Sequence, residues 1–205
     1  RRHRLELTIV QADVHDLIGN IENDARTKQA QTYAALIDRL RAAGAECAAI
    51  TSLGGHFCFA ETEALSTLPL ISAVRPIDAY CRDLGLNRSG LLGTELVMRT
   101  KLYGQLNSVE PVVLEQEIGF LGRTYQEMAV AGVCSTKQRE VFVSAGRRLV
   151  EDHGAEAVVL AGTDLNLAFD EAAVDYPLVD PVDAHVQVLV QLASDEVDIR
   201  EFEVA

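Results

Sequence analysis

Short apolar runs alternate along the chain with longer segments in which apolar side chains recur every three or four residues. The short runs predict β-strands at residues 5–10, 47–50, 70–73, 89–94, 111–114, 157–160 and 177–179. The longer segments predict helices at residues 23–43, 61–65, 77–83, 97–106, 122–131, 137–153 and 182–192. A last alternation, between Val197 and Phe202, is compatible with an edge strand. Buried strands that alternate with amphipathic helices predict an α/β fold with parallel sheets flanked by helices.

One helix-strand-loop unit occurs twice in the chain. Gly44-Ala45-Glu46 introduces one apolar run, and Gly154-Ala155-Glu156 introduces another. Each run ends in a loop of small and polar residues, Thr51-Ser52-Leu53-Gly54 in the first copy and Ala161-Gly162-Thr163-Asp164 in the second. Counted from the glycines, Ser52 and Gly162 occupy equivalent positions. We interpret this pattern as an internal duplication, because the same supersecondary unit recurs in the same order.

The duplication predicts two pseudo-symmetric lobes, each a parallel sheet flanked by helices. We expect residues 1–85 and 173–205 to form lobe 1, and residues 86–172 to form lobe 2. Ligands of parallel sheets bind beyond the carboxyl ends of the strands. We therefore expect the two equivalent loops to face each other across a ligand cleft between the lobes.

Composition narrows the range of partners. The net charge of −13 argues against broad affinity for nucleic acid or for an anionic membrane surface. No apolar run approaches the ~20 residues of a membrane span. The four cysteines lack the spacing of a metal or redox motif, which predicts reduced thiols in a cytoplasmic protein.

Several short motifs resemble, in order and spacing, those of one enzyme family. They are Gly44-Ala45-Glu46, Gly90-Leu91-Leu92-Gly93-Thr94 with Tyr103 following, Ala131-Gly132, Gly154-Ala155-Glu156 before Val158-Val159-Leu160, and Pro177-Leu178-Val179-Asp180-Pro181. Together they resemble the aspartate/glutamate racemase superfamily over nearly all of the chain. The resemblance implies a two-lobed α/β fold, isomerase chemistry on a small carboxylate without PLP or another cofactor, no metal, and a homodimer.

The chain departs from the resemblance at both catalytic positions. The first loop of the family reads roughly Ala-Cys-Asn-Thr-Ala-His, and here Ser52 replaces the cysteine while His56 is kept. The second loop reads roughly Gly-Cys-Thr-Glu, and here Gly162 replaces the cysteine, Thr163 is kept and Asp164 replaces the longer acid. Within residues 1–205 there is also no counterpart of the family's first strand and its Gly-rich loop.

These replacements exclude racemisation by two cysteines at these positions. Cofactor-free racemisation removes a proton from one face of the α-carbon and returns one to the other, so it needs two groups with tunable pKa values. A cysteine can serve in this way. Glycine transfers no proton, and a serine hydroxyl becomes basic only beside another base.

Two interpretations of the remaining polar residues stay open. In the first, the chain is a diverged enzyme with His56, Asp164 and Ser52 as catalytic candidates. Its substrate-binding candidates are Thr51, Gly54, Gly55, Thr94 and Thr163. In the second, the chain is a catalytically inactive binding, regulatory or scaffold protein, which Leu53 favours because it is apolar where a polar contact is expected.

Each candidate also has a structural explanation. His56 suits the start of a helix, and Asp164 and Thr163 suit a helix N-cap whatever the function. A nucleotide-binding α/β domain is a weaker third interpretation, because the chain has neither a Walker A motif nor G-x-G-x-x-G.

Overall fold

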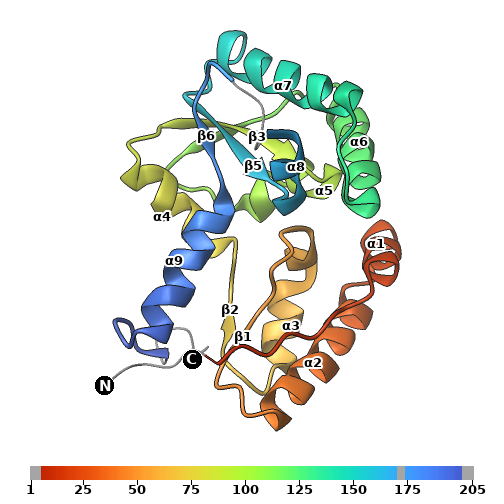
Figure 1. Cartoon of the computed structure of the whole chain (residues 1–205), viewed down its shortest axis with the longest axis vertical. Helices are drawn as coiled ribbons and strands as arrows, with labels where there is room; N and C mark the ends of the chain where they lie inside the picture. The colour runs from red at the N-terminus through yellow and green to blue at the C-terminus, as the bar shows by residue number, and fades with distance from the viewer. Residues whose placement is uncertain (1–5, 170–173, 200–205) are drawn as a thin grey trace. The chain divides into compact units, whose positions relative to one another are not determined.

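The computed structural model describes residues 6–169 and 174–199, which divide into two compact units. Unit 1 comprises Arg1–Thr51, Gly55–Ala73 and Val186–Ala205, and unit 2 comprises Ser52–Gly54 and Val74–His185. Each unit contains one parallel β-sheet, and helices flank both sheets (Figure 1). The predicted α/β class with parallel sheets is confirmed.

Unit 1 has the smaller sheet. Its elements are α1 (Val14–Glu22), α2 (Arg26–Ala42), β1 (Ala48–Ala49), the 3₁₀ helix η1 (Gly54–Cys58) except for its first residue, α3 (Phe59–Leu65), β2 (Leu70–Ile71) and the part of α9 (Pro181–Ala193) that begins at Val186. β1 and β2 pair in parallel. Helix α2 packs against both α1 and α3. It does so through buried residues that recur at helical spacing, among them Ala30, Tyr33 and Ile37.

Unit 2 is built on a four-stranded parallel sheet in the order β4-β3-β5-β6. Its strands are β3 (Arg88–Gly93), β4 (Glu110–Val112), β5 (Ala157–Ala161) and β6 (Leu178–Val179). Its helices are α4 (Arg75–Asp83), α5 (Glu95–Arg99), η2 (Leu102–Gly104), α6 (Ile118–Ala131), α7 (Thr136–Glu151), η3 (Thr163–Leu165), α8 (Asn166–Phe169) and the start of α9 (Pro181–Ala193). Helix α7 lies against β3 and β5. Gly90 permits this approach, because a Cβ there would lie 2.9 Å from Cβ of Leu149.

The first predicted strand is wrong over its described part. Residues 6–10 form no strand, and Leu7 and Ile9 are 75% and 81% exposed. Alternation alone does not make a strand, because the ladder also needs a partner. Helix α1 follows, and the Asp13 side chain caps it by accepting from His15 N and Asp16 N. At the other end, residues 197–199 form no strand, and the rest of that alternation lies outside the described residues.

Three segments lie in a different unit from the one that the duplication predicts. The loop residues Ser52–Gly54, helix α4 and the segment with strand β6 belong to unit 2, although residues 1–85 and 173–205 are the expected lobe 1. Strand β6 joins unit 2 because it pairs with β5. Helix α4 is attached by the Asp78 carboxylate, which accepts from two backbone N–H groups just before β4 at 3.0 and 2.9 Å.

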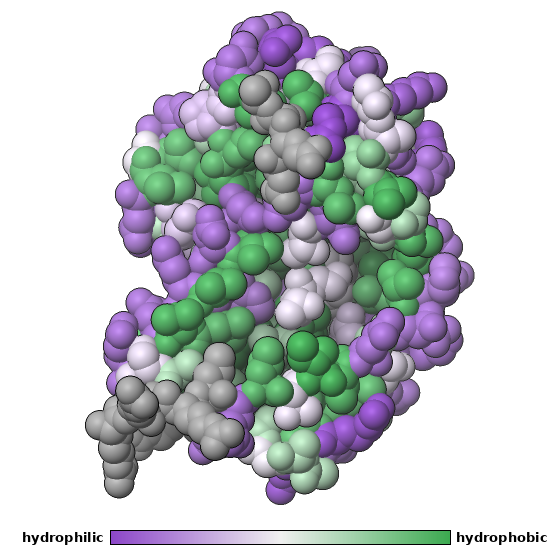
Figure 2. All heavy atoms as spheres, viewed as in Figure 1, coloured by the Kyte–Doolittle hydropathy of each residue, from purple (hydrophilic) through white to green (hydrophobic). Residues whose placement is uncertain are grey.

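The surface mixes hydrophilic residues with scattered large apolar ones. Apolar side chains gather along α9 (Figure 2), where Val186 and Val190 are 46% and 56% exposed. No helix among the described residues has both the length and the apolar character needed to cross a membrane.

Candidate functional site

The second loop leaves the sheet of unit 2 beside the end of β3. Gly93 and Ala161 are paired and are the last residues of their strands, so Thr94 and Gly162 emerge next to each other. The chain then turns at once into η3, with Leu165 N donating to Gly162 O at 2.9 Å. Thr163 and Asp164 are therefore held at the edge of a parallel sheet where ligands bind.

A tyrosine ring fills the space in which a side chain at residue 162 would lie. A Cβ built on Gly162 would be 2.5 Å from Cε2, 2.6 Å from Cζ and 2.8 Å from Oη of Tyr125. The φ of Gly162 is −165°, which any residue can adopt. Space, and not backbone conformation, thus requires glycine at this position.

The same tyrosine is bonded to the carboxylate of the second loop. The Tyr125 hydroxyl donates to Asp164 Oδ2 at 2.9 Å. Tyr125 is 7% exposed, whereas Asp164 is half-buried. Burial, and after it the charge of Asp164, raises the pKa of Tyr125 far above its usual value. The hydroxyl consequently stays protonated and acts on Asp164 as a hydrogen-bond donor.

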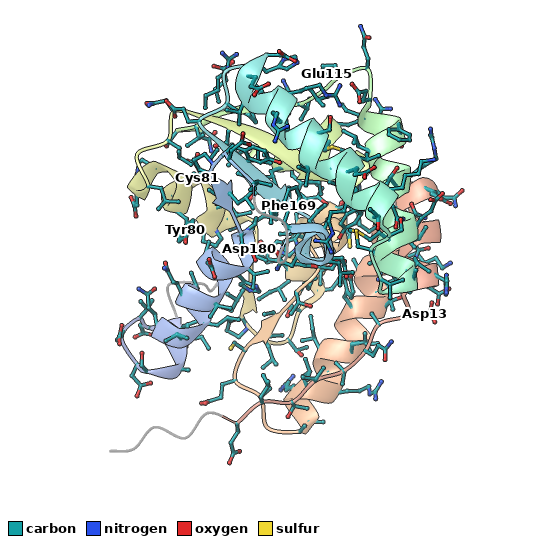
Figure 3. The ribbon with its side chains drawn as sticks, turned by 45° about the horizontal axis from the view of Figure 1, so that its top comes forward. Asp13, Tyr80, Cys81, Glu115, Phe169 and Asp180 are labelled. Atoms are coloured by element: carbon teal, nitrogen blue, oxygen red, sulfur yellow. The ribbon has the colours of Figure 1, made fainter. Side chains whose placement is uncertain are left out.

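A second carboxylate, Asp180, fixes the segment that follows Asp164. It comes directly after β6 (Figure 3), and its Oδ2 accepts from Asn166 Nδ2 at 2.8 Å. Its Oδ1 accepts from Val182 N at 2.9 Å. Because Asn166 begins α8, Asp180 ties the end of β6 to the helix that follows the second loop.

The two threonines of unit 2 occupy helix starts. Thr94 Oγ1 accepts from Val97 N at 3.2 Å and caps α5. Thr163 is the first residue of η3 and is half-buried. A substrate-binding role for either hydroxyl stays a prediction.

The first loop is held by Tyr103. Its hydroxyl lies 2.9 Å from Leu53 O and 3.1 Å from Gly54 O and donates to these carbonyls. Leu53 is only 2% exposed, so its side chain belongs to the packed interior. Ser52 is half-buried. The apolar residue of this loop thus serves packing, while Ser52 keeps partial access to solvent.

Tyr103 lies in a strained segment of the backbone. Lys101, Leu102 and Tyr103 have φ values of 50°, 56° and 58°, and Gly104 follows at 66°. Non-glycine residues in the left-handed region each cost about 1–2 kcal/mol. Full burial of Leu102 and a bond from Tyr103 N to Thr100 Oγ1 at 3.1 Å hold the strained turn. Such strain is maintained where the surrounding structure over-determines it, as at binding sites.

His56 serves as a backbone acceptor in unit 1. It lies in η1, is 4% exposed, and its Nε2 accepts from Ala73 N at 3.0 Å. Its ring stacks on Phe59 with a centroid distance of 5.0 Å. The bond from Ala73 places the ring proton on Nδ1 and occupies the basic nitrogen, so proton transfer by His56 would require that bond to break.

The remaining predicted residues differ in exposure. Thr51 is exposed at the end of the segment after β1, and Gly54 and Gly55 are buried within η1. Binding roles for all three stay predictions.

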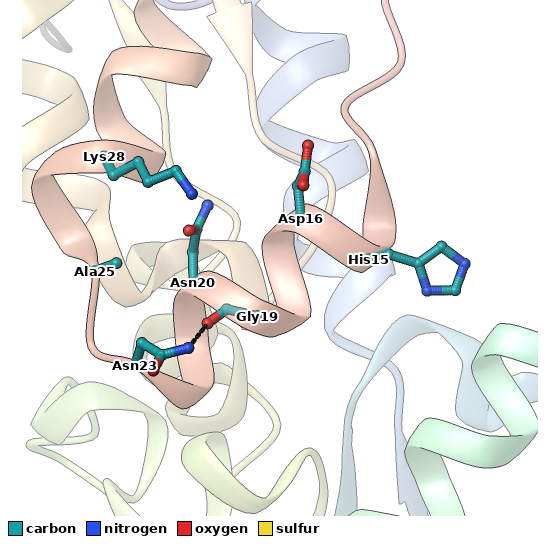
Figure 4. A pocket seen from close by; sticks show the side chains of 7 residues that line it. All are labelled: His15, Asp16, Gly19, Asn20, Asn23, Ala25 and Lys28. Carbon is teal, nitrogen blue, oxygen red and sulfur yellow. Dashed lines mark hydrogen bonds between the residues drawn. The ribbon is translucent and has the colours of Figure 1, made fainter.

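Two hollows of the surface are lined by none of the predicted site residues. One, with a volume of about 280 Å³, lies on α1 and the start of α2, where Asn23 Nδ2 donates to Gly19 O (Figure 4). The other, of about 350 Å³, lies between α6 and α7 beside the ion pair of Glu117 with Arg148. We locate the candidate site by the loops after β3 and β5, because the chemistry-bearing residues lie there.

Comparison with known sequences assigns the chain to a family. The sequence profile of the Asp/Glu/Hydantoin racemase family matches residues 1–189. The chain belongs to this family.

Solved structures of this racemase family share the fold. A candidate Asp/Glu racemase from Yersinia pestis superposes with a TM-score of 0.77 at 21% identity, covering 95% of this chain and 86% of that one. An aspartate racemase homologue from Pyrococcus horikoshii gives 0.73 at 27% identity, covering 92% and 84%. A glutamate racemase from Francisella tularensis, solved with D-glutamate, gives 0.64 at 18% identity, covering 87% and 65%.

Sequence reasoning missed the most unusual residue of this candidate site. Tyr125 lies inside a predicted helix and acts 39 residues away, at Asp164, so no local pattern marks it. The glycine at residue 162 is the only signal in the sequence, because a glycine at a position that the family resemblance marks as catalytic leaves a space to be filled. Among residues 6–169 and 174–199, no three His, Cys, Asp or Glu side chains are grouped to hold a metal ion.

Proposed function

We propose that this chain is a diverged racemase-family enzyme that acts on a small amino-acid-like or other carboxylate substrate by cofactor-independent, non-thiol acid/base chemistry. The observation that carries the proposal is the bond between Tyr125 and Asp164 at the end of β5. It provides a half-buried, oriented carboxylate beside Gly162, where the family resemblance implies a thiol.

Asp164 is the first candidate for proton transfer. A carboxylate held in a fixed orientation and partly shielded from water suits general acid/base work. One such group can remove a proton from a carbon and return it to the same face or to another atom. This chemistry fits an isomerase or a lyase without the second base of a racemase. Ser52 and His56 remain further catalytic candidates, and Thr51, Gly54, Gly55, Thr94 and Thr163 remain candidates for substrate binding.

The state of the cysteines supports a non-thiol mechanism. Burial raises the pKa of Cys47 and Cys58, and it raises that of Cys81 to about 11. The thiolate is the reactive form, so burial lowers the reactivity of these three side chains at neutral pH. Cys134, the fourth, lies before α7, with its Sγ 3.5 Å from Ser135 O.

The second candidate function is that of a catalytically inactive binding protein. Two observations favour it: the Nε2 of His56 is occupied by Ala73 N, and Gly162 carries no group that transfers protons. The substrate class would be unchanged, because the loops after β3 and β5 would still bind a small carboxylate.

Turnover of a small carboxylate separates the two functions. In D₂O we expect no deuterium at the α-carbon of aspartate or glutamate above background with either function, since no cysteine remains on either loop. A panel of other small carboxylates, followed by ¹H NMR for turnover and by ligand-observed NMR for binding, identifies the substrate. If wild type and Asp164→Asn bind a carboxylate equally well and neither converts any member of the panel, the binding function replaces the enzymatic one.

We also infer a homodimer in the cytoplasm. The dimer is implied by the family, and native mass spectrometry that gives a monomer would contradict it. All four cysteines are free, which supports a reducing compartment.

A further inference from the structure

Gly162 and Tyr125 form a complementary pair. Three atoms of the Tyr125 side chain, two of the ring and the hydroxyl oxygen, would all lie within 2.8 Å of a Cβ at residue 162, which is far inside van der Waals contact. Those atoms belong to the rigid end of the ring and not to a flexible chain. Any side chain at residue 162 therefore requires a smaller residue at 125.

Tyr125 is fixed in this place from two sides. Its helix, α6, packs against η3 and against β3. Its hydroxyl is bonded to Asp164, the second residue of η3. The ring thus cannot turn away from Gly162 without breaking the bond to a charged partner, which is stronger than a neutral hydrogen bond.

We propose that Tyr125 is a specificity-determining residue of this site. The ring of Tyr125, which comes from α6, occupies the space that a side chain at residue 162 would take. It thereby limits the size of the ligand substituent that fits beside Gly162. The proposal rests on the proposed function, because it concerns the same carboxylate-binding loops. It adds that the size of the accepted substituent is set by the tyrosine ring. It also adds that the ring keeps Asp164 aligned through the hydroxyl.

A double-mutant cycle in melting temperature tests whether the Tyr125 ring occupies the space that a side chain at residue 162 would need. Gly162→Ala should lower the melting temperature on the order of 5 °C, because overpacking a rigid neighbour is destabilising. In a Tyr125→Ala background the same change should cause no further decrease. Gly19→Ala is the matched control, since nothing lies within 4 Å of a Cβ at that helical position; it should cause no decrease in either background. Equal decreases for Gly162→Ala in both backgrounds would show that the Tyr125 ring does not occupy the space of a side chain at residue 162.

Ligand selectivity tests the functional part, with acetate and phenylacetate as probes that differ by one phenyl ring. Affinities are measured by NMR titration for wild type, Tyr125→Phe and Tyr125→Ala. Removing the ring should raise the affinity ratio of phenylacetate to acetate about 10–100-fold, the value of burying an aromatic group. Tyr125→Phe keeps the ring and should keep the ratio, although it loses the hydroxyl. If Tyr125 has only a structural role, both variants should be less stable than wild type, and the affinity ratio of phenylacetate to acetate should stay at the wild-type value in both.

The outcomes distinguish this inference from the proposed function. If acetate binds wild type and the ratio does not change in Tyr125→Ala, Tyr125 is a packing residue and the inference is overturned while carboxylate binding stands. If neither probe binds any of the three proteins, carboxylate binding and the specificity role both fail, and a positive double-mutant cycle then leaves only the packing of Tyr125 against Gly162.

Discussion

The two loops of the duplicated unit occupy equivalent places in the sequence and satisfy their polar groups in opposite ways. In the first, the side chain of His56 accepts from the backbone at Ala73. In the second, the carboxylate of Asp164 accepts from another side chain, Tyr125. A group bonded to backbone at the end of a strand is part of the scaffold. A half-buried group oriented by a buried side chain remains able to meet a ligand.

The contrast extends to the positions that the family resemblance marks as catalytic. Ser52 keeps a polar side chain and is followed by Leu53, which is packed inside. Gly162 has no side chain, yet the ring of Tyr125, which comes from α6, fills the place and donates its hydroxyl to Asp164 of the same loop. The two equivalent positions therefore lie in two different environments, and at the second a tyrosine from a distant helix orients a carboxylate of the loop.

The largest expected effect is on turnover. With a substrate in hand, Asp164→Asn should reduce kcat about 10²–10⁴-fold, the usual contribution of an acid/base group, while the protein stays folded. His56→Gln retains an acceptor for Ala73 N but removes the titratable ring, and we expect less than a tenfold loss. Steady-state kinetics with circular dichroism as a folding control give both values. The reverse ranking would make the first loop the catalytic one.

The next effect is on stability, at His56. His56→Ala leaves the buried N–H of Ala73 without its acceptor, which should lower the free energy of unfolding by about 1–3 kcal/mol. His153→Ala removes an exposed histidine and should change it by less than about 0.5 kcal/mol. Urea denaturation measures both. Equal values would mean that the His56 bond contributes no more than an exposed side chain.

Much of the fold was accessible from the sequence, because buried strands and amphipathic helices have clear periods. Strand β5 and helices α2, α6 and α7 coincide with predicted segments. The failures have physical causes. Leu7 and Ile9 alternate as in a strand but have no partner strand, and β6 joins the sheet of unit 2 through a pairing that no local pattern reveals. The site was predicted only as far as its loops, since Tyr125 approaches from a distant helix.

A smaller effect on the free energy of unfolding is expected when one tyrosine hydroxyl is removed at each loop. Tyr125→Phe removes a donor to a charged carboxylate and should cost about 1.5–3 kcal/mol, whereas Tyr103→Phe removes a donor to the neutral carbonyls of Leu53 and Gly54 and should cost about 0.5–1.5 kcal/mol. Chemical denaturation of the two variants gives the difference directly. A larger loss for Tyr103→Phe would show that the strained turn, and not the charge of the partner, decides how firmly a loop is held.

The smallest expected effect is that of thiol modification, which should leave function unchanged. Iodoacetamide at neutral pH should modify the half-exposed Cys134 first. Cys58 and Cys81 should react slowly, because both are buried and burial raises their pKa values. The labelling of Cys81 should accelerate only as the pH rises toward about 11, the pKa of its thiol. Mass spectrometry follows the labelling, with denatured protein as the control in which all four cysteines react. Turnover or ligand affinity could instead fall in step with the labelling of Cys58, the thiol two residues after His56. That result would place a reactive cysteine at the first loop and reverse the contrast between the two loops.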